Sequence, residues 1–128
     1  MKRIIIALAA ALISFAAVAQ EQNVTKIMEQ VIADDFQIVS DKVEDGVRYI
    51  VAIPSAKVCS NQIDIQIENG IIQSVVYTRG CDGNAKGIGA LIKGMSVEEA
   101  IKRLDGITCG KRPTSCPDQL AKVLKQLN

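Results

Sequence analysis

Four cysteines are the residues of this sequence best suited to chemistry: Cys59, Cys81, Cys109 and Cys116. A thiolate is a soft metal ligand and a nucleophile, so four in a small chain indicate a metal site, two disulfides or redox chemistry. The chain contains no histidine, so no imidazole can replace a thiolate as a ligand. The four cysteines are not spaced as a pair of C-x-x-C motifs. Their spacing alone therefore does not distinguish a metal site from two disulfides or redox chemistry.

The N-terminus has the pattern of a secretory signal peptide. Lys2 and Arg3 precede an apolar stretch at 4–18, and Ala17-Val18-Ala19 is a small-x-small cleavage site. The stretch is about 15 residues long, shorter than the roughly 20 that span a bilayer as a retained anchor. We therefore expect residues 1–19 to be a cleaved signal and the mature protein to be extracytoplasmic, either periplasmic or secreted, with no membrane segment.

Composition limits the mature chain further. Removing 19 of 128 residues leaves 109, which fits one domain with a modest core. The loss of Lys2 and Arg3 leaves 13 of the 15 basic residues against 14 acidic ones, a net charge of −1. With few aromatic residues and no basic excess, nucleic-acid binding is not expected. The sequence indicates no particular protein partner or oligomeric state.

Periodicity predicts one helix and two hairpins in the first half of the mature chain. Asn23 can cap a helix, and the apolar residues that follow share one face. One hairpin joins residues 36–39 to 47–53 through a loop ending in Asp45-Gly46, and the other joins 63–67 to 71–77 across Asn69-Gly70. The apolar residues of the helix are Val24, Ile27, Met28, Val31 and Ile32.

After Gly80 the apolar period changes from 2 to 3.6, which predicts three helices. The first covers 84–93, and the second follows the capping box Ser96 to Glu99 and runs to Leu104. The third begins near Ser115 or Cys116. The residues expected to face the core are Ile88, Leu91 and Ile92 in the first helix and Leu120, Val123, Leu124 and Leu127 in the third.

These elements predict an α+β fold in which a small antiparallel sheet of about four strands is packed by an N-terminal helix and three C-terminal helices. Cys81 lies just before one of those helices and Cys116 begins another. Helix N-termini carry partial positive charge, so both thiols are well placed to act as thiolates. Lys111 and Arg112, beside Cys109, are expected to offset thiolate charge or to face water.

Several separated blocks of the chain resemble the TSCPD domain family, named for the pentapeptide found here at 114–118. Such domains occur as small stand-alone proteins and as the C-terminal module of cobalamin-dependent ribonucleotide reductases. The resemblance implies a domain at 54–128, with residues 20–53 as an N-terminal extension made of the first helix and hairpin. The matching blocks are 57–60, 80–84, 86–88, Leu91, 94–95, 106–110 and 114–120.

The resemblance also implies that the four cysteines bind a metal, and the metal expected from this family is zinc. We therefore expect a secreted, non-catalytic metal-binding module related to the accessory domain of ribonucleotide reductases, with the ligands Cys59, Cys81, Cys109 and Cys116. The oxidising compartment favours two disulfides instead, and four cysteines permit three pairings. Redox-active thiols, with Cys109 and Cys116 as the pair, or an iron–sulfur cluster are further alternatives.

Family association would also assign the label ribonucleoside-diphosphate reductase. That reaction needs a large barrel carrying radical and reductant cysteines, which about 109 residues do not supply. We therefore expect no catalysis by this chain alone.

Overall fold

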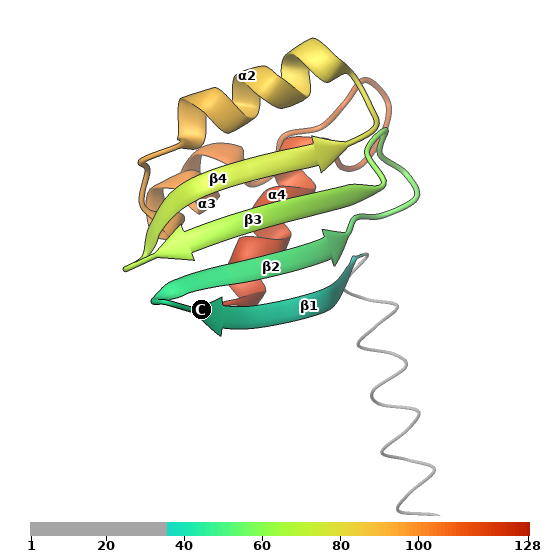
Figure 1. Cartoon of the computed structure of the whole chain (residues 1–128). Helices are drawn as coiled ribbons and strands as arrows, with labels where there is room; N and C mark the ends of the chain where they lie inside the picture. The colour runs from blue at the N-terminus through green and yellow to red at the C-terminus, as the bar shows by residue number, and fades with distance from the viewer. Residues whose placement is uncertain (1–35) are drawn as a thin grey trace, which may run out of the picture. The chain divides into compact units, whose positions relative to one another are not determined.

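A four-stranded antiparallel sheet is the centre of the fold in the computed structural model, which describes residues 36–128 (Figure 1). The strands lie side by side in sequence order, as predicted. The helix expected after Asn23 lies outside the described residues. The strands are β1 (Gln37–Glu44), β2 (Val47–Ile53), β3 (Gln62–Glu68) and β4 (Ile71–Thr78).

Both predicted hairpin turns are confirmed. Asp45 and Gly46 have φ angles of 51° and 80°, and Asn69 and Gly70 have φ angles of 50° and 74°. Two successive positive φ angles suit the right-handed twist of the strands that the turn joins. Asn, Asp and Gly tolerate this conformation better than other residues, which is why these dipeptides identified the turns in the sequence.

The strand β1 is longer than the segment 36–39 that was predicted. It continues to Glu44 and contains an irregularity between Ile38 and Ser40. Most of the added residues are polar and exposed, because β1 is an edge strand; Ser40 is half-buried, and Val43 is apolar but exposed. An edge strand of this kind has no apolar alternation by which periodicity could detect it.

Three helices follow the sheet: α2 (Asp82–Ile92), α3 (Val97–Leu104) and α4 (Cys116–Gln126). Figure 1 shows α3 and α4 behind the sheet and α2 beside β4. The packing is closest between α3 and α4 and between α2 and β4. None of the helices in residues 36–128 is long and apolar enough to cross a membrane.

The core lies between one face of the sheet and the helices. Ile63, Ile65 and Ile67 of β3 are buried while the alternating polar residues are not, as the period of 2 predicted. From α4, Leu120, Val123 and Leu124 are fully buried, and Leu127 packs at the margin. Burying each such side chain contributes about 1.5–3 kcal/mol.

The prediction for α2 was wrong in two details. The helix begins at Asp82, two residues before the predicted start, with Cys81 as its N-cap. Ile92 is buried and Ile88 packs against the core, but Leu91 is 79% exposed. The reason is that this side of α2 faces a pocket rather than the sheet.

The capping box before α3 forms only in part. Ser96 Oγ accepts a hydrogen bond from the Glu99 N–H at 3.2 Å, as expected. The Glu99 carboxylate instead accepts a hydrogen bond from Arg103 at 2.6 Å. This ion pair one turn along the helix replaces the contact to the Ser96 backbone that the motif predicted.

Candidate functional site

All four cysteines line one pocket of about 460 Å³. Cys81 is the N-cap of α2, Cys116 is the first residue of α4, and the other two lie in loops before β3 and before α4. No disulfide joins any of the four in this structure; Cys116 is half-buried, and Cys59, Cys81 and Cys109 are exposed. The fold therefore brings four segments that are distant in sequence to one pocket.

The sulfur atoms do not form a coordination sphere in this arrangement. Within residues 36–128, no three cysteine, aspartate or glutamate side chains are close enough together to hold a metal ion. The thiols surround a shared space, and a common ligand would have to draw them inward. A change of side-chain rotamer is the least costly way for exposed cysteines to do so.

The pocket walls are mainly apolar. They are formed by residues of β4, α2 and the loop before α4, with Leu91 and Ile107 exposed beside the cysteines. Hydrogen bonds and charge interactions are stronger next to apolar surface than in bulk water. The remaining apolar side chains of the wall are Val58, Tyr77, Ala85, Ile88 and Pro117.

Two side chains donate hydrogen bonds to the sulfur atoms. Ser60 Oγ donates to Cys116 Sγ at 3.1 Å, and Arg112 Nη1 donates to Cys59 Sγ at 3.3 Å. The pKa of Arg112 lies above its usual value, first because of this hydrogen bond and then because of its electrostatic interaction with Cys59. The side chain of Arg112 thus contacts Cys59 rather than its neighbour Cys109, and its role in offsetting thiolate charge stays a prediction.

Gly80 allows the loop of Cys59 to approach the turn that carries Cys81. Its φ of 97° is a conformation that L side chains rarely adopt. A Cβ atom at this position would lie 3.4 Å from both the Cβ of Cys59 and the backbone nitrogen of Ser60. The turn that carries Cys81 thus lies against the loop of Cys59, and its positive φ angle is the feature that favours glycine.

Tyr77 connects β4 to the start of α4. Its hydroxyl donates to the backbone oxygen of Cys116 at 3.2 Å. Burial raises the pKa of Tyr77, and the nearby Cys116 thiolate raises it further. The hydroxyl therefore stays protonated and remains a donor at physiological pH.

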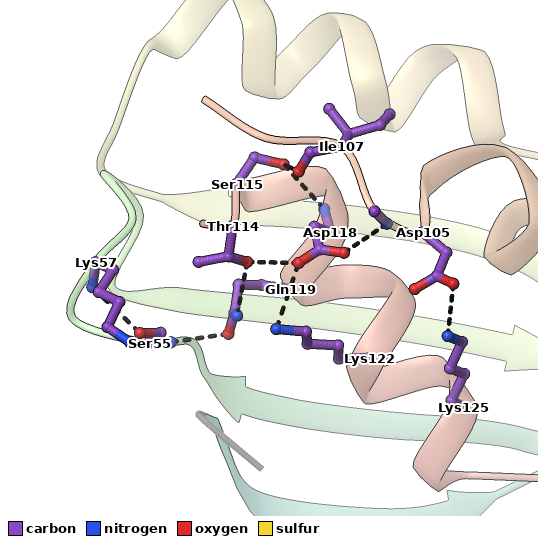
Figure 2. Close-up of polar contacts among 11 residues, drawn as sticks. Ser55, Lys57, Asp105, Ile107, Thr114, Ser115, Asp118, Gln119, Lys122 and Lys125 are labelled. Atoms are coloured by element: carbon purple, nitrogen blue, oxygen red, sulfur yellow. Dashed lines mark hydrogen bonds and ion pairs between the residues drawn. The ribbon is translucent and has the colours of Figure 1, made fainter. Parts of the chain in front are cut away.

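A buried polar cluster lies beside the pocket; it comprises Ser55, Thr114, Ser115, Asp118 and Gln119 (Figure 2). The Asp118 carboxylate is its centre. Thr114 Oγ1 donates to it at 2.6 Å and the Gly106 N–H at 2.7 Å, and Lys122 lies 3.4 Å away. Among the described residues, no buried side-chain nitrogen or oxygen lacks a partner.

The ionisation of Asp118 is favoured despite its burial. Desolvation raises the pKa of this carboxyl, but hydrogen bonds from Thr114 and Gly106 and the charge of Lys122 together outweigh it. The net pKa of Asp118 is therefore below its usual value. A charged acceptor makes stronger hydrogen bonds than a neutral one, so the cluster holds the chain around it firmly.

Ser115 fixes the loop that carries Cys109. Its hydroxyl accepts a hydrogen bond from the Asp118 N–H at 3.1 Å, which caps α4. The same hydroxyl donates to the backbone oxygen of Ile107 at 2.7 Å. Together with the bond from Gly106 to Asp118, this places the residues just before Cys109 against the start of α4.

Gln119 fixes the loop that carries Cys59. Its side chain is fully buried, and it donates to Thr114 Oγ1 at 3.0 Å. Its Oε1 accepts from the Ser55 N–H at 2.9 Å, across 64 positions of sequence. The polar residues at 114–119 therefore join three of the cysteine-bearing segments, those of Cys59, Cys109 and Cys116.

Sequence reasoning did not identify this cluster. The spacing of Ser115 and Asp118 is that of a helix cap, and this signal was available in the sequence. The contact between Gln119 and Ser55 gave no local signal, because its partners are far apart in the chain.

Comparison with known proteins agrees with the resemblance of the sequence. The profile of the TSCPD domain matches residues 39–128, which is more than half of the chain. The matched range starts within β1, and the boundary expected at residue 54 stays a prediction. No curated protein and no solved structure gives a significant match. On the strength of the profile match, the chain belongs to the TSCPD domain family.

Proposed function

We propose that this TSCPD domain is a zinc-binding module without catalytic activity of its own. Cys59, Cys81, Cys109 and Cys116 would hold one ion. The observation that carries the proposal is that these thiols, from four separate segments, line a single pocket. Four thiolates are a donor set that suits a closed tetrahedral zinc site.

The charges around the pocket support this assignment. Zinc with four thiolates has a net charge of −2, which is costly beside apolar walls unless it is offset. Arg112 and Ser60 already donate to sulfur, and Cys81 and Cys116 lie at helix N-termini, where partial positive charge gathers. A bound ion would cross-link the four segments and add its binding free energy to that of folding.

The proposal includes an extracytoplasmic location, because the sequence pattern of residues 1–19 is that of a secretory signal. These residues lie outside the described structure. Cell fractionation followed by mass measurement of the isolated chain tests the location. A cytoplasmic protein that retains its N-terminus would contradict it.

Thiol–disulfide chemistry is the second candidate, and the observation that favours it is that the four cysteines line one pocket and three of them are exposed. In an oxidising compartment, exposed thiols can pair. Cys109 and Cys116 are the closest in sequence and the first pair to examine.

The family relationship is compatible with a module related to ribonucleotide reductase. We propose that any such relation concerns the shared module and not the reaction. Residues 36–128 form a small sheet with three helices rather than a catalytic barrel. Binding of cobalamin or of a nucleoside diphosphate by the purified chain would contradict this view.

Intact mass under native conditions decides between the candidates, using protein purified without chelators. A zinc site predicts one bound ion per chain and four titratable thiols after denaturation. A pair of disulfides predicts loss of four hydrogens and no metal, which would overturn the proposal. Chelation should lower the unfolding temperature of the zinc-loaded protein.

A further inference from the structure

We propose that Arg112 is a positioning residue of the metal site, whose guanidinium restrains the sulfur of Cys59 by a hydrogen bond. This inference rests on the proposed zinc-binding function. It assigns the contact between Arg112 Nη1 and Cys59 Sγ, at 3.3 Å, a role in retaining metal. The two residues are 53 positions apart in sequence.

The backbone of Arg112 is held close to Cys109. Its N–H donates to the backbone oxygen of Cys109 at 3.0 Å, and the Cys109 N–H donates to the oxygen of Thr114 at 3.3 Å. These bonds close the loop between Cys109 and Cys116 on itself. Because Thr114 belongs to the polar cluster, the base of the Arg112 side chain is anchored to the most firmly bonded part of the domain.

Cys59 is in a less regular setting. It is exposed and lies in the loop between β2 and β3, which is neither helix nor strand. The polar cluster fixes this loop at Ser55, and Gly80 supports Cys59 from one side. Arg112 adds a hydrogen bond to the sulfur itself, which restrains the side chain of this ligand.

The guanidinium is suited to this position in charge and in shape. It has five N–H donors in a planar fork, so it can remain bonded to Cys59 while it lies near other thiolates. The side chains that line the pocket include two arginines, Arg79 and Arg112, and no carboxylate. A donor to sulfur next to a doubly negative zinc–thiolate centre stabilises that centre without replacing a ligand.

Arg79 provides the matched control. It lines the same pocket and carries the same charge, but the hydrogen bonds to sulfur within residues 36–128 come from Ser60 and Arg112. Replacing either arginine with glutamine removes one positive charge from the pocket. Only Arg112→Gln also removes the donor to Cys59.

The test compares wild type, Arg112→Gln, Arg112→Lys and Arg79→Gln. Zinc affinity is measured by competition with a chromophoric chelator, and Co²⁺ is substituted to record the sulfur-to-metal charge-transfer bands. Loss of an outer hydrogen bond to a metal ligand typically lowers affinity 10- to 100-fold. We expect Arg112→Gln to lose about 10-fold in affinity and to shift the Co²⁺ bands, and Arg112→Lys to recover part of both. Arg79→Gln, which removes a charge but no hydrogen bond to sulfur, should lose less affinity than Arg112→Gln and keep the wild-type Co²⁺ bands.

Circular dichroism verifies that each variant folds, which is expected because Arg112 is exposed. Equal affinities for wild type and Arg112→Gln, or equal losses for Arg112→Gln and Arg79→Gln, would overturn the role of Arg112 and leave the zinc site standing. A wild-type protein that binds neither Zn²⁺ nor Co²⁺ would overturn the proposed function, and the role of Arg112 with it.

Discussion

The polar cluster and the cysteine pocket are neighbours with opposite physical character. The cluster residues Ser55, Thr114, Ser115, Asp118 and Gln119 are each at most 7% exposed and are hydrogen-bonded to one another or to nearby backbone. In the pocket, three of the four thiols are exposed, and the walls are mainly apolar. One region is fixed by its bonds, whereas the other is left adaptable.

The same pentapeptide contributes to both regions. Thr114 and Asp118 belong to the cluster, Cys116 and Pro117 line the pocket, and Ser115 belongs to both. The difference indicates a division of roles: the polar residues hold the loops in place, and the sulfur atoms stay available to a ligand. If this is correct, variants of the cluster should lose stability, and variants of the pocket should lose binding.

The largest expected effect on stability comes from Asp118→Ala. It leaves the Gly106 N–H, the Thr114 hydroxyl and Lys122 without their shared acceptor. Breaking a buried, charged network of this kind costs about 3 kcal/mol. Urea unfolding of the metal-free protein measures the loss of stability. The control is Asp82→Ala, which should leave stability nearly unchanged because Asp82 forms only an exposed ion pair with Lys86.

The helix α2 contacts β4 on one side and lines the pocket on the other, which allows a matched pair of substitutions. Gly89 faces the sheet, where an added Cβ would lie 2.6 Å from the backbone oxygen of Val75. Gly87 lines the pocket, where an added Cβ meets nothing within 4 Å. We expect Gly89→Ala to destabilise the fold by about 2 kcal/mol and Gly87→Ala to stabilise it by about 0.5–1 kcal/mol.

Thermal and urea unfolding of both variants measure this contrast. A stabilising Gly89→Ala would mean that α2 can move away from β4 at little cost. The boundary between the rigid scaffold and the adaptable pocket would then lie at β4 rather than along α2.

Protonation of Asp118 is expected to have a smaller effect than truncation, because the side chain stays in place. The pKa of this carboxyl is lowered in the folded protein, mainly by the bonds that offset its burial. The resulting stabilisation is fully present above the unfolded pKa of about 3.9 and is lost as pH falls through the lower folded value. Asp118→Asn removes this dependence.

Unfolding free energies of wild type and Asp118→Asn, measured from pH 7 to pH 3, give the difference that belongs to Asp118. Subtracting the variant removes the contributions of other carboxyls, such as Asp41, whose pKa is also lowered by its hydrogen bond to Arg48. Parallel curves would mean that the cluster does not depend on an ionised carboxylate.

Local signals were sufficient for most of the fold. Asp45-Gly46 and Asn69-Gly70 fixed both hairpins because each turn needs two positive φ angles. The core face of α4 followed from its apolar period. The outer half of β1 and the exposure of Leu91 could not be predicted, since each depends on what lies opposite the residue in the folded chain.

The site was less predictable than the fold. The sequence supplied the four thiols and the helix starts at Cys81 and Cys116, and family resemblance suggested a shared function. The contacts that organise the site, from Gln119 to Ser55 and from Arg112 to Cys59, span 64 and 53 positions. No local pattern encodes pairings over such distances.

The smallest expected effect on the fold comes from Cys59→Ser in the metal-free protein. Because Cys59 is exposed, serine should change stability by no more than about 0.5 kcal/mol. Serine is a poor substitute for a thiolate ligand, so zinc should add almost no stability to Cys59→Ser. Asp118→Ala should be less stable than wild type without metal, but zinc should still stabilise it. Unfolding of both variants with and without zinc measures these responses. If the metal-free Cys59→Ser protein were as unstable as Asp118→Ala, the pocket and the cluster would form one structural unit.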